Sequence, residues 1–184
     1  MTSDLVQRAQ RGDGRAFDEL IRAAYDRLFA TAHRILRDRD AAEDAVQDAV
    51  VRCWRDLRGL RDSDRFEAWL YRLLVNACRD HARRARRRPS VAYGEHVDLP
   101  VEGDAFALLA EQDALERAFL ALPTDQRVAL VLTHYVGYSA PELAAILGVP
   151  TGTVYSRIHY GARAMRVALS PSPAVRAATT ESSR

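Results

Sequence analysis

Three polar side chains near the C-terminus have the spacing of a DNA-reading surface. Ser156, His159 and Arg163 recur at helical intervals, and on a helix they lie opposite an apolar row. That row consists of Val154, Ile158, Met165 and Leu169. A hydroxyl, an imidazole and a guanidinium on one exposed face can hydrogen-bond to base edges or to phosphates. We therefore expect this helix to bind duplex DNA.

A second group of polar residues is strongly basic and suits a single strand. On a helix spanning 66–88, the side opposite the leucines carries Arg72, Asn76, Arg79 and Arg83. Residues 65–88 hold eight arginines against two acidic residues, whereas a solvated face normally alternates signs. Trp69 and Tyr71 flank this basic row, and guanidinium with aromatic groups suits backbone tracking and base stacking. Trp69 fits core packing equally well. The polar loop 58–65 is placed to contact an unstacked base.

A third group combines acidic and apolar side chains on the helix predicted at 40–57. Its members are Glu43, Asp44, Gln47, Asp48 and Val51, and the opposite side, including Trp54, is expected to build the core. Acidic residues near a helix start are favourable in themselves, so this patch can be a solvated helix N-terminus. It can equally be a docking surface for a basic protein. The pattern alone leaves these two alternatives open.

The elements that hold the first group form a helix-turn-helix. Ser139 with Glu142 predicts a capping box, and Pro141 falls in the first turn. Gly148 follows the last residue of this short helix, where a left-handed conformation favours glycine. Thr151 is expected to cap the second helix. An ordinary helical hairpin is the alternative, but the cap, the glycine turn and the polar outer face together favour DNA binding.

Charge and composition divide the rest of the chain. The 184 residues are 48% hydrophobic, with no sustained alternating pattern, so we predict an all-α protein of two small helical domains. Residues 1–88 carry a net charge of +5, residues 89–116 carry −7, and residues 117–184 carry +4. We predict a first domain at 1–88, a flexible acidic linker at 89–104, a helix-turn-helix domain at 105–169 and a disordered tail at 170–184. Two basic blocks around an acidic one indicate two polyanion-binding domains.

Several classes of protein are disfavoured by what the sequence contains. Cys53 and Cys78 lack CxxC or Cys/His spacing, so we expect buried, reduced thiols and no zinc site. The five histidines and the scattered acids show no metal or nucleophile pattern, and we expect no cofactor and no enzymatic activity. The N-terminus has no apolar signal core and no run reaches membrane-spanning length, so a cytoplasmic protein is expected.

A free-standing helix-turn-helix regulator is the main alternative function. Such proteins usually bind as symmetric dimers through a dimerisation or ligand module. This sequence offers no heptads and no evident ligand module, but it does contain a second, differently built nucleic-acid surface.

Three blocks, in this order, resemble the extracytoplasmic-function (ECF, group IV) sigma factors of bacterial RNA polymerase, over about residues 5–169. They are AAEDAVQDAVVRCWRDL, FEAWLYRLLVNACRDHARRARRR and LPTDQRVALVLTHYVGYSAPELAAILGVPTGTVYSRIHYGARAMR. The resemblance implies core RNA polymerase (β′ clamp and β flap), promoter DNA and an anti-sigma factor as partners. Tyr155 and Tyr160 stand where the family often has basic residues.

The resemblance also implies roles for individual residues. Contacts with the β′ clamp would come from Asp44, Gln47, Asp48 and Val51. The −10 element would meet Asp62, Ser63, Arg72, Asn76, Arg79 and Arg83. The −35 element would meet Thr153, Ser156, Arg157, His159 and Arg163. The acidic linker would follow the RNA-exit path of the polymerase.

Overall fold

The computed structural model describes residues 2–87 and 104–170, and these residues form helices and turns without any strand. The predicted all-α fold is confirmed. The segments predicted as linker (89–104) and tail (170–184) lie almost entirely outside the described residues.

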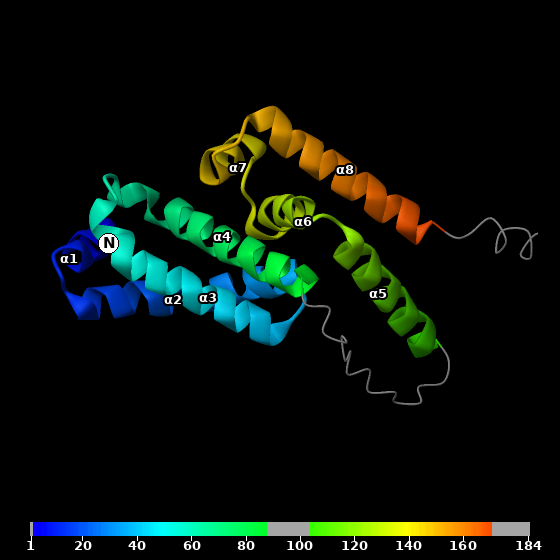
Figure 1. The fold of residues 1–184 in the computed structure, drawn as a ribbon, viewed down its shortest axis with the longest axis horizontal. Helices are drawn as coiled ribbons and strands as arrows, with labels where there is room; N and C mark the ends of the chain where they lie inside the picture. The colour runs from blue at the N-terminus through cyan, green and yellow to red at the C-terminus, as the bar shows by residue number, and fades with distance from the viewer. Residues whose placement is uncertain (1, 88–103, 171–184) are drawn as a thin grey trace, which may run out of the picture.

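Four helices form the N-terminal lobe, drawn in blue to green in Figure 1: α1 (Thr2–Gln10), α2 (Gly14–Leu36), α3 (Arg39–Asp56) and α4 (Phe66–Arg87). An aspartate caps the N-terminus of α2 and another caps that of α3. The Asp13 carboxylate accepts a hydrogen bond from the backbone N–H of Ala16 at 3.1 Å, and Asp38 does the same for Ala41 at 2.9 Å. These caps satisfy backbone donors that the first helical turn leaves unpaired.

The core of this lobe lies where α2, α3 and α4 pack side by side. Leu28, Val46, Leu70 and Leu74 are almost completely buried there, together with many alanines that allow close helix approach. The connection from α3 to α4, expected to be a polar loop, contains two short 3₁₀ turns at Leu57–Gly59 and Ser63–Arg65. This lobe therefore presents α4 and its preceding turn on a rigid support.

The C-terminal lobe contains α5 (Asp104–Ala121), α6 (Thr124–Val131), a π-helical turn (Leu132–Val136), α7 (Ala140–Leu147) and α8 (Thr151–Leu169). Its core includes the buried Val128, Leu132, Leu143 and Val154. Gly161 lets α8 pass close to α6, because a Cβ at this position would lie 3.1 Å from the Leu130 side chain. The lobe thus places α7 across α8, as a helix-turn-helix requires.

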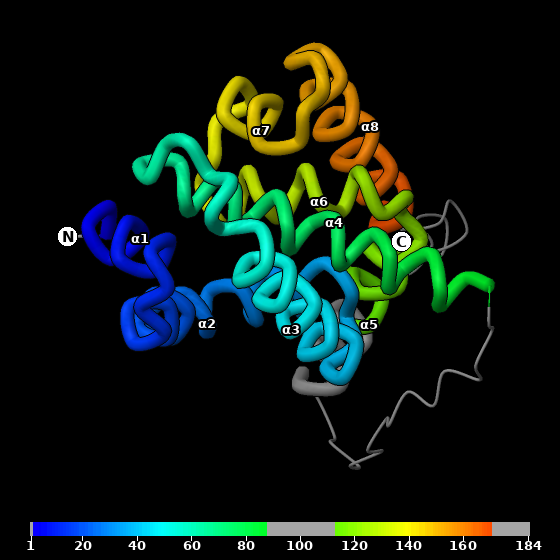
Figure 2. Tube along the Cα trace, turned by 60° about the vertical axis from the view of Figure 1, so that its left-hand side comes forward, coloured from blue at the N-terminus to red at the C-terminus, as the bar shows by residue number. Residues whose placement is uncertain are grey.

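The two lobes pack against each other. Helix α6 contacts α2 and α4, and α7 contacts α4. Figures 1 and 2 both show α4 running beside α6, with α7 and α8 beyond it. Buried residues of both lobes form one continuous hydrophobic cluster. Helices α6 and α7 therefore meet α2 and α4 along one seam between the lobes.

Candidate nucleic-acid interface

The helix-turn-helix has the local geometry that the sequence predicts at its start and its turn. The Ser139 hydroxyl lies 2.6 Å from the Glu142 carboxylate, which also accepts a hydrogen bond from the Ser139 backbone N–H at 2.8 Å. These hydrogen bonds hold the pKa of Glu142 below its ordinary value. Gly148 follows α7 in the left-handed region, with φ of 65°. The capping box and the glycine turn are confirmed.

The start of α8 differs from the prediction. Thr151 is the first helical residue rather than the cap, and Pro150 precedes it in an extended conformation without any side-chain cap. The Pro150 carbonyl instead accepts the backbone N–H of Thr153 at 2.9 Å. The fixed φ of proline sets the direction in which the chain enters the helix.

The outer face of α8 carries most of the predicted −35 residues. Ser156, His159 and Arg163 are exposed, and Thr153 is half-buried. The Ser156 hydroxyl donates to the carbonyl of Gly152 at 2.9 Å while its lone pairs remain available. Three of the predicted side chains therefore stand on one accessible face.

Arg157 behaves differently from the other predicted α8 residues. Its Nη2 lies 2.7 Å from Oδ2 of Asp125 in the first turn of α6, and its Nη1 is buried without a hydrogen-bond partner among the described residues. Its guanidinium thus packs against the supporting helix in this conformation.

Two tyrosines extend the α8 face. Tyr155 is 59% exposed and Tyr160 is 57% exposed, although tyrosine usually buries much of its ring. The ring of Tyr160 meets that of His159 edge-on, with centroids 5.5 Å apart. Helical periodicity did not pick out Tyr155 and Tyr160. The one feature of the sequence that singled them out is that tyrosines stand where the resembling family often has basic residues.

The basic row of α4 is only partly accessible. Arg72 and Arg83 are exposed, and Arg83 also forms an ion pair with Asp80 at 3.0 Å. Asn76 is half-buried, and its Oδ1 lies 3.4 Å from Nη1 of Arg79. Arg79 also pairs with Asp125 across the seam at 2.8 Å, which leaves its side chain 25% exposed. Arg72 and Arg83 are therefore accessible, whereas the opposing lobe partly covers Arg79 between them.

The two aromatic residues beside this row, Trp69 and Tyr71, differ in how deeply they are buried. Trp69 is half-buried and lines a hollow with Arg72, Tyr138 and Ile146. Tyr71 is buried, with its ring edge-on to Tyr138 at a centroid distance of 5.6 Å. Burial raises the pKa of Tyr71 and raises that of Tyr138 to about 12. The suggestion that Tyr71 flanks an accessible row is wrong in this conformation, because α4 turns this ring into the seam.

The turn that precedes α4 is organised by Asp62. Its carboxylate accepts the backbone N–H of Asp64 at 3.0 Å and lies 3.3 Å from Nε of Arg65. Asp62 is exposed and Ser63 is half-buried next to it. Both side chains are therefore held on a defined turn at the beginning of the basic helix.

The acidic and apolar patch on α3 is an exposed surface. Asp44 and Gln47 are exposed, and Val51 is one of the more exposed large hydrophobic residues in the described chain. Asp48 is half-buried and lies 3.1 Å from the imidazole of His81 on α4. Asp44, Gln47 and Val51 are therefore accessible to solvent on this helix.

The prediction that Trp54 on α3 lies in the core is wrong. Its side chain is 51% exposed and meets the ring of Phe17 edge-on at a centroid distance of 4.8 Å. Cys53, next to it, fills the buried position instead. One face of the indole thus covers α2 while the remainder extends the α3 surface.

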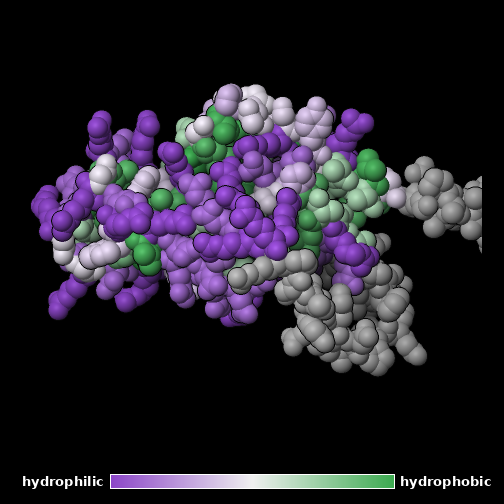
Figure 3. Space-filling view, in the orientation of Figure 1, coloured by the Kyte–Doolittle hydropathy of each residue, from purple (hydrophilic) through white to green (hydrophobic). Residues whose placement is uncertain are grey.

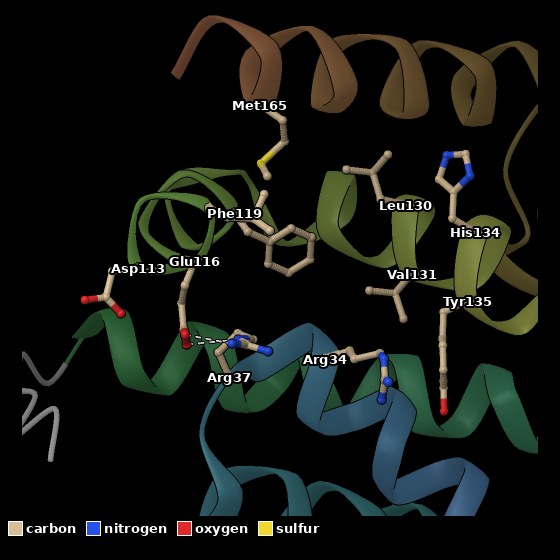
Figure 4. A pocket seen from close by; sticks show the side chains of 11 residues that line it. Arg34, Arg37, Asp113, Glu116, Phe119, Leu130, Val131, His134, Tyr135 and Met165 are labelled. Atoms are coloured by element: carbon tan, nitrogen blue, oxygen red, sulfur yellow. Dashed lines mark hydrogen bonds and ion pairs between the residues drawn. The ribbon is translucent and has the colours of Figure 1, made fainter. Parts of the chain in front are cut away.

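A hollow of about 590 Å³ opens between α2 and the C-terminal lobe. Its apolar wall includes Leu115, Phe119, Leu130 and Met165, and Figure 4 shows Phe119 and Met165 projecting into this space. At its edge Arg37 pairs with Glu116 at 2.7 Å. Figure 3 shows a mainly hydrophilic surface over α2–α4 and hydrophobic patches over α7 and the end of α8.

Other kinds of site find little support in residues 2–87 and 104–170. No three His, Cys, Asp or Glu side chains gather there in a way that could hold a metal ion. Within the same residues, no helix is both long and apolar enough to cross a membrane. Cys53 and Cys78 are buried free thiols, as expected, and burial raises the pKa of each to about 12.

Two solved structures with a similar fold are complexes of two proteins. CnrH, in complex with the cytosolic domain of CnrY, aligns with a TM-score of 0.66 at 30% identity, covering 93% of this chain and 98% of CnrH. The sigma factor RpoE of Bartonella quintana, in complex with the anti-sigma factor NepR, aligns with a TM-score of 0.59 at 23% identity, covering 85% and 98%. At 23% identity, the similarity to RpoE is one of fold alone.

Sequence comparisons give the family. The model of Sigma-70 region 2 matches residues 20–88, and that of Sigma-70 region 4 matches residues 112–165. The RNA polymerase sigma-H factor of Pseudomonas aeruginosa is 32% identical over 179 residues, covering 91% of this chain and 93% of the relative. The ECF sigma factor SigM of Mycobacterium tuberculosis is 36% identical over 155 residues, covering 84% and 78%. With two helical lobes that carry a basic helix and a helix-turn-helix, this chain belongs to the ECF sigma factors of RNA polymerase.

Proposed function

We propose that this protein is an alternative sigma factor that binds core RNA polymerase and directs it to a specific set of promoters. The observation that carries the proposal is the presence of two separate polar faces, one on each lobe. The basic row of α4 suits a strand, and the outer face of α8 suits a duplex groove. Neither face is equipped for bond-breaking chemistry, so we propose a binding role in initiation, in the cytoplasm with the polymerase.

The faces divide the work of promoter recognition. Asp44, Gln47, Asp48 and Val51 would bind the β′ clamp, and the C-terminal lobe would bind the β flap. The −10 element would be held by Arg72, Asn76, Arg79 and Arg83, with Asp62 and Ser63 at the displaced base. The −35 element would be read by Thr153, Ser156, His159 and Arg163, and Arg157 would join them where it leaves Asp125.

We assign these roles to two domains, residues 1–88 and 105–169, separated by the acidic segment 89–104. This segment holds four acidic residues and no arginine, so it would be repelled by DNA and would leave the basic faces to bind it.

Control by an anti-sigma factor is part of the proposal. The similar structure of RpoE contains the bound anti-sigma factor NepR, and that of CnrH contains the cytosolic domain of CnrY. In this chain, the hollow lined by Leu115, Phe119, Leu130 and Met165 offers an apolar wall to an amphipathic helix of such a partner.

Run-off transcription tests the proposed function. Core RNA polymerase from the source organism, or from a close relative, is incubated with a genomic promoter pool with and without this protein. We expect new transcripts whose start sites share one upstream and one −10 sequence. A protein that instead forms a palindrome-binding dimer and never associates with core polymerase would be a free-standing regulator, and the proposal would fail.

A further inference from the structure

Helix α1 supports the connection between α3 and α4, residues 57–65. The side-chain Nε2 of Gln10, the last residue of α1, donates to the carbonyl of Leu57 at 3.1 Å and to that of Leu60 at 2.6 Å. The two carbonyls lie at the start and directly after the end of the 3₁₀ turn that follows α3. An amide nitrogen has two N–H groups, so Gln10 can satisfy both carbonyls at once.

The corner between α1 and α2 holds Gln10 in place. Nε and Nη2 of Arg8 lie 3.0 Å and 2.7 Å from Oδ2 of Asp13, so this ion pair spans the corner. Gly12, within the corner, has a φ of 97°, a left-handed conformation that glycine adopts without strain. Ala9 is buried and Gln10 is half-buried. The amide of Gln10 is therefore presented by a braced corner.

The remaining hydrogen bonds of this connection are local. The Asp62 carboxylate accepts the N–H of Asp64 at 3.0 Å, and the Leu60 N–H donates to the carbonyl three residues earlier at 3.1 Å. In the part of the chain that the structure describes, Gln10 is the one side chain from another helix that hydrogen-bonds to the backbone of 57–65. Local bonds shape a turn, whereas its placement depends on neighbouring elements. Helix α1, which contacts both short turns, therefore helps to set where Asp62 stands.

We propose that Gln10 is a positioning residue for recognition of the displaced −10 base, and that it acts by placing the connection that carries Asp62 and Ser63. Gln10 works through the backbone of that connection and does not itself touch DNA. A flipped base is read by hydrogen bonds to its edge, which require donor and acceptor within about 3.2 Å. A small shift of the connection therefore weakens recognition of that base. This inference rests on the proposed function of Asp62 and Ser63.

A charge-matched pair of variants on α1 tests the role of the amide. Gln10→Glu keeps the size of the side chain but replaces the donor with a carboxylate, which the two carbonyl oxygens repel. Gln7→Glu adds the same charge three residues away, at an exposed position of α1. Both variants lower the net charge equally, so a general electrostatic loss of DNA binding appears in both.

The placement of the connection is measured first, by hydrogen–deuterium exchange and mass spectrometry of the full-length proteins. We expect peptides that cover 57–65 to exchange about tenfold faster in Gln10→Glu than in the wild type, because two hydrogen bonds that hold this segment are lost. Gln7→Glu should exchange at the wild-type rate. Exchange in 57–65 that stays unchanged in Gln10→Glu would overturn the proposal.

Base selectivity is measured next, with core RNA polymerase and promoter templates. Each position of the −10 sequence found by run-off transcription is substituted in turn, and open complexes are counted. We expect Gln10→Glu to reduce the preference for the original base about tenfold at one position, a loss that corresponds to about 1.4 kcal/mol. Preferences at the other positions and binding of core polymerase should match Gln7→Glu. A uniform loss at every position, or unchanged selectivity, would contradict a positioning role.

A second variant protects the test against misfolding. Gln10→Met keeps a side chain of similar length and adds no charge, but it cannot donate to the carbonyls, and Gln7→Met is its control. If Gln10→Glu loses helicity by circular dichroism, Gln10→Met must reproduce both the faster exchange and the lost selectivity, and its failure to do so counts against the proposal. Normal transcription by the wild type with unchanged selectivity in the Gln10 variants rejects the positioning role alone. A wild-type protein that neither initiates nor binds core polymerase rejects the proposed function.

Discussion

The imidazole of His81 on α4 holds the carboxylate of Asp48 on α3, with 3.1 Å between Nε2 and Oδ2. The histidine side chain is mostly enclosed, while Asp48 remains partly exposed at the edge of the acidic patch. The surface assigned to the polymerase is therefore supported by the helix assigned to the −10 element. This hydrogen bond connects the acidic patch on α3 with the helix that carries the basic row.

Charge reversal on the α3 patch should abolish polymerase binding. Asp44 and Asp48 lie one helical turn apart, so both can meet one basic surface. The double variant Asp44→Arg, Asp48→Arg should lose association with core polymerase in a pull-down while its helicity stays at the wild-type level. The matched control reverses two exposed acids on α2, Asp18→Arg and Asp26→Arg, and should still bind.

The contribution of the histidine can be separated from that of the carboxylates. His81→Ala keeps both acidic groups but removes the support of Asp48, and we expect a smaller loss of polymerase affinity than in the double variant. Normal binding by a folded Asp44→Arg, Asp48→Arg protein would remove the assignment of this face.

The exposed guanidinium of Arg163 should read the upstream element. If it contacts a guanine, Arg163→Ala should cost about 1–3 kcal/mol of binding free energy and relax the preference at one position. If it contacts only phosphate, the loss should be uniform across sequences and the salt dependence should become shallower. Competition binding of holoenzyme to a library of upstream elements distinguishes the two.

The control for this measurement is Arg166→Ala. Arg166 is also exposed on α8, and its Nε lies 3.4 Å from the carbonyl of Ala162. Equal effects of the two substitutions would indicate a general charge effect, and no effect of Arg163→Ala would mean that α8 presents another face to DNA.

Asn76 should matter for promoter melting more than for promoter binding. Its amide can donate to and accept from a base edge, and it also lies beside Arg79. Asn76→Ala should impair open-complex formation on duplex promoters much more than on templates with a mismatch bubble. Permanganate footprinting of unpaired thymines measures this step, and closed-complex binding to the −35 element should stay normal.

A conservative variant separates the two roles of Asn76. Asn76→Asp keeps an acceptor for the Arg79 guanidinium but loses the amide donor. Recovery of melting in Asn76→Asp would make Asn76 a positioning residue for Arg79, whereas continued failure would support direct contact with a base. Wild-type footprints from Asn76→Ala would show that melting depends on other residues.

The two buried cysteines should make the folded protein less stable as the pH rises into the alkaline range. Burial raises the pKa of Cys53 and of Cys78 from 9.0 to about 12. The folded state therefore retains protons that the unfolded chain releases above about pH 9, so the free energy of unfolding should fall as pH rises from 9 towards 12. Urea denaturation at several pH values measures this loss.

Alkylation provides the independent check on the thiols. Iodoacetamide at neutral pH should label neither cysteine in the native protein and both in denaturant, because the thiolate is the reactive form. Cys53→Ala and Cys78→Ala variants assign any residual labelling. Rapid modification of the native protein would mean that one of these sites opens readily to solvent.

The features that the sequence determined by itself are those whose interactions span a few residues. The Ser139–Glu142 capping box and the turn at Gly148 involve neighbours in the chain, so their residue types alone predict them. The outward side of α8 at Ser156, His159 and Arg163 followed from helical periodicity for the same reason.

Only the tertiary structure decided which of the predicted side chains are free. Asp125 is 46 residues from Arg79 and 32 residues from Arg157, and no local pattern indicates that one carboxylate holds both. Tyr71 entered the seam and Trp54 reached the surface because the packing of neighbouring helices, rather than helical spacing alone, sets the exposure of side chains at the edge of an apolar stripe. Periodicity gives the direction in which a side chain points, whereas the element that lies opposite depends on how the whole chain folds.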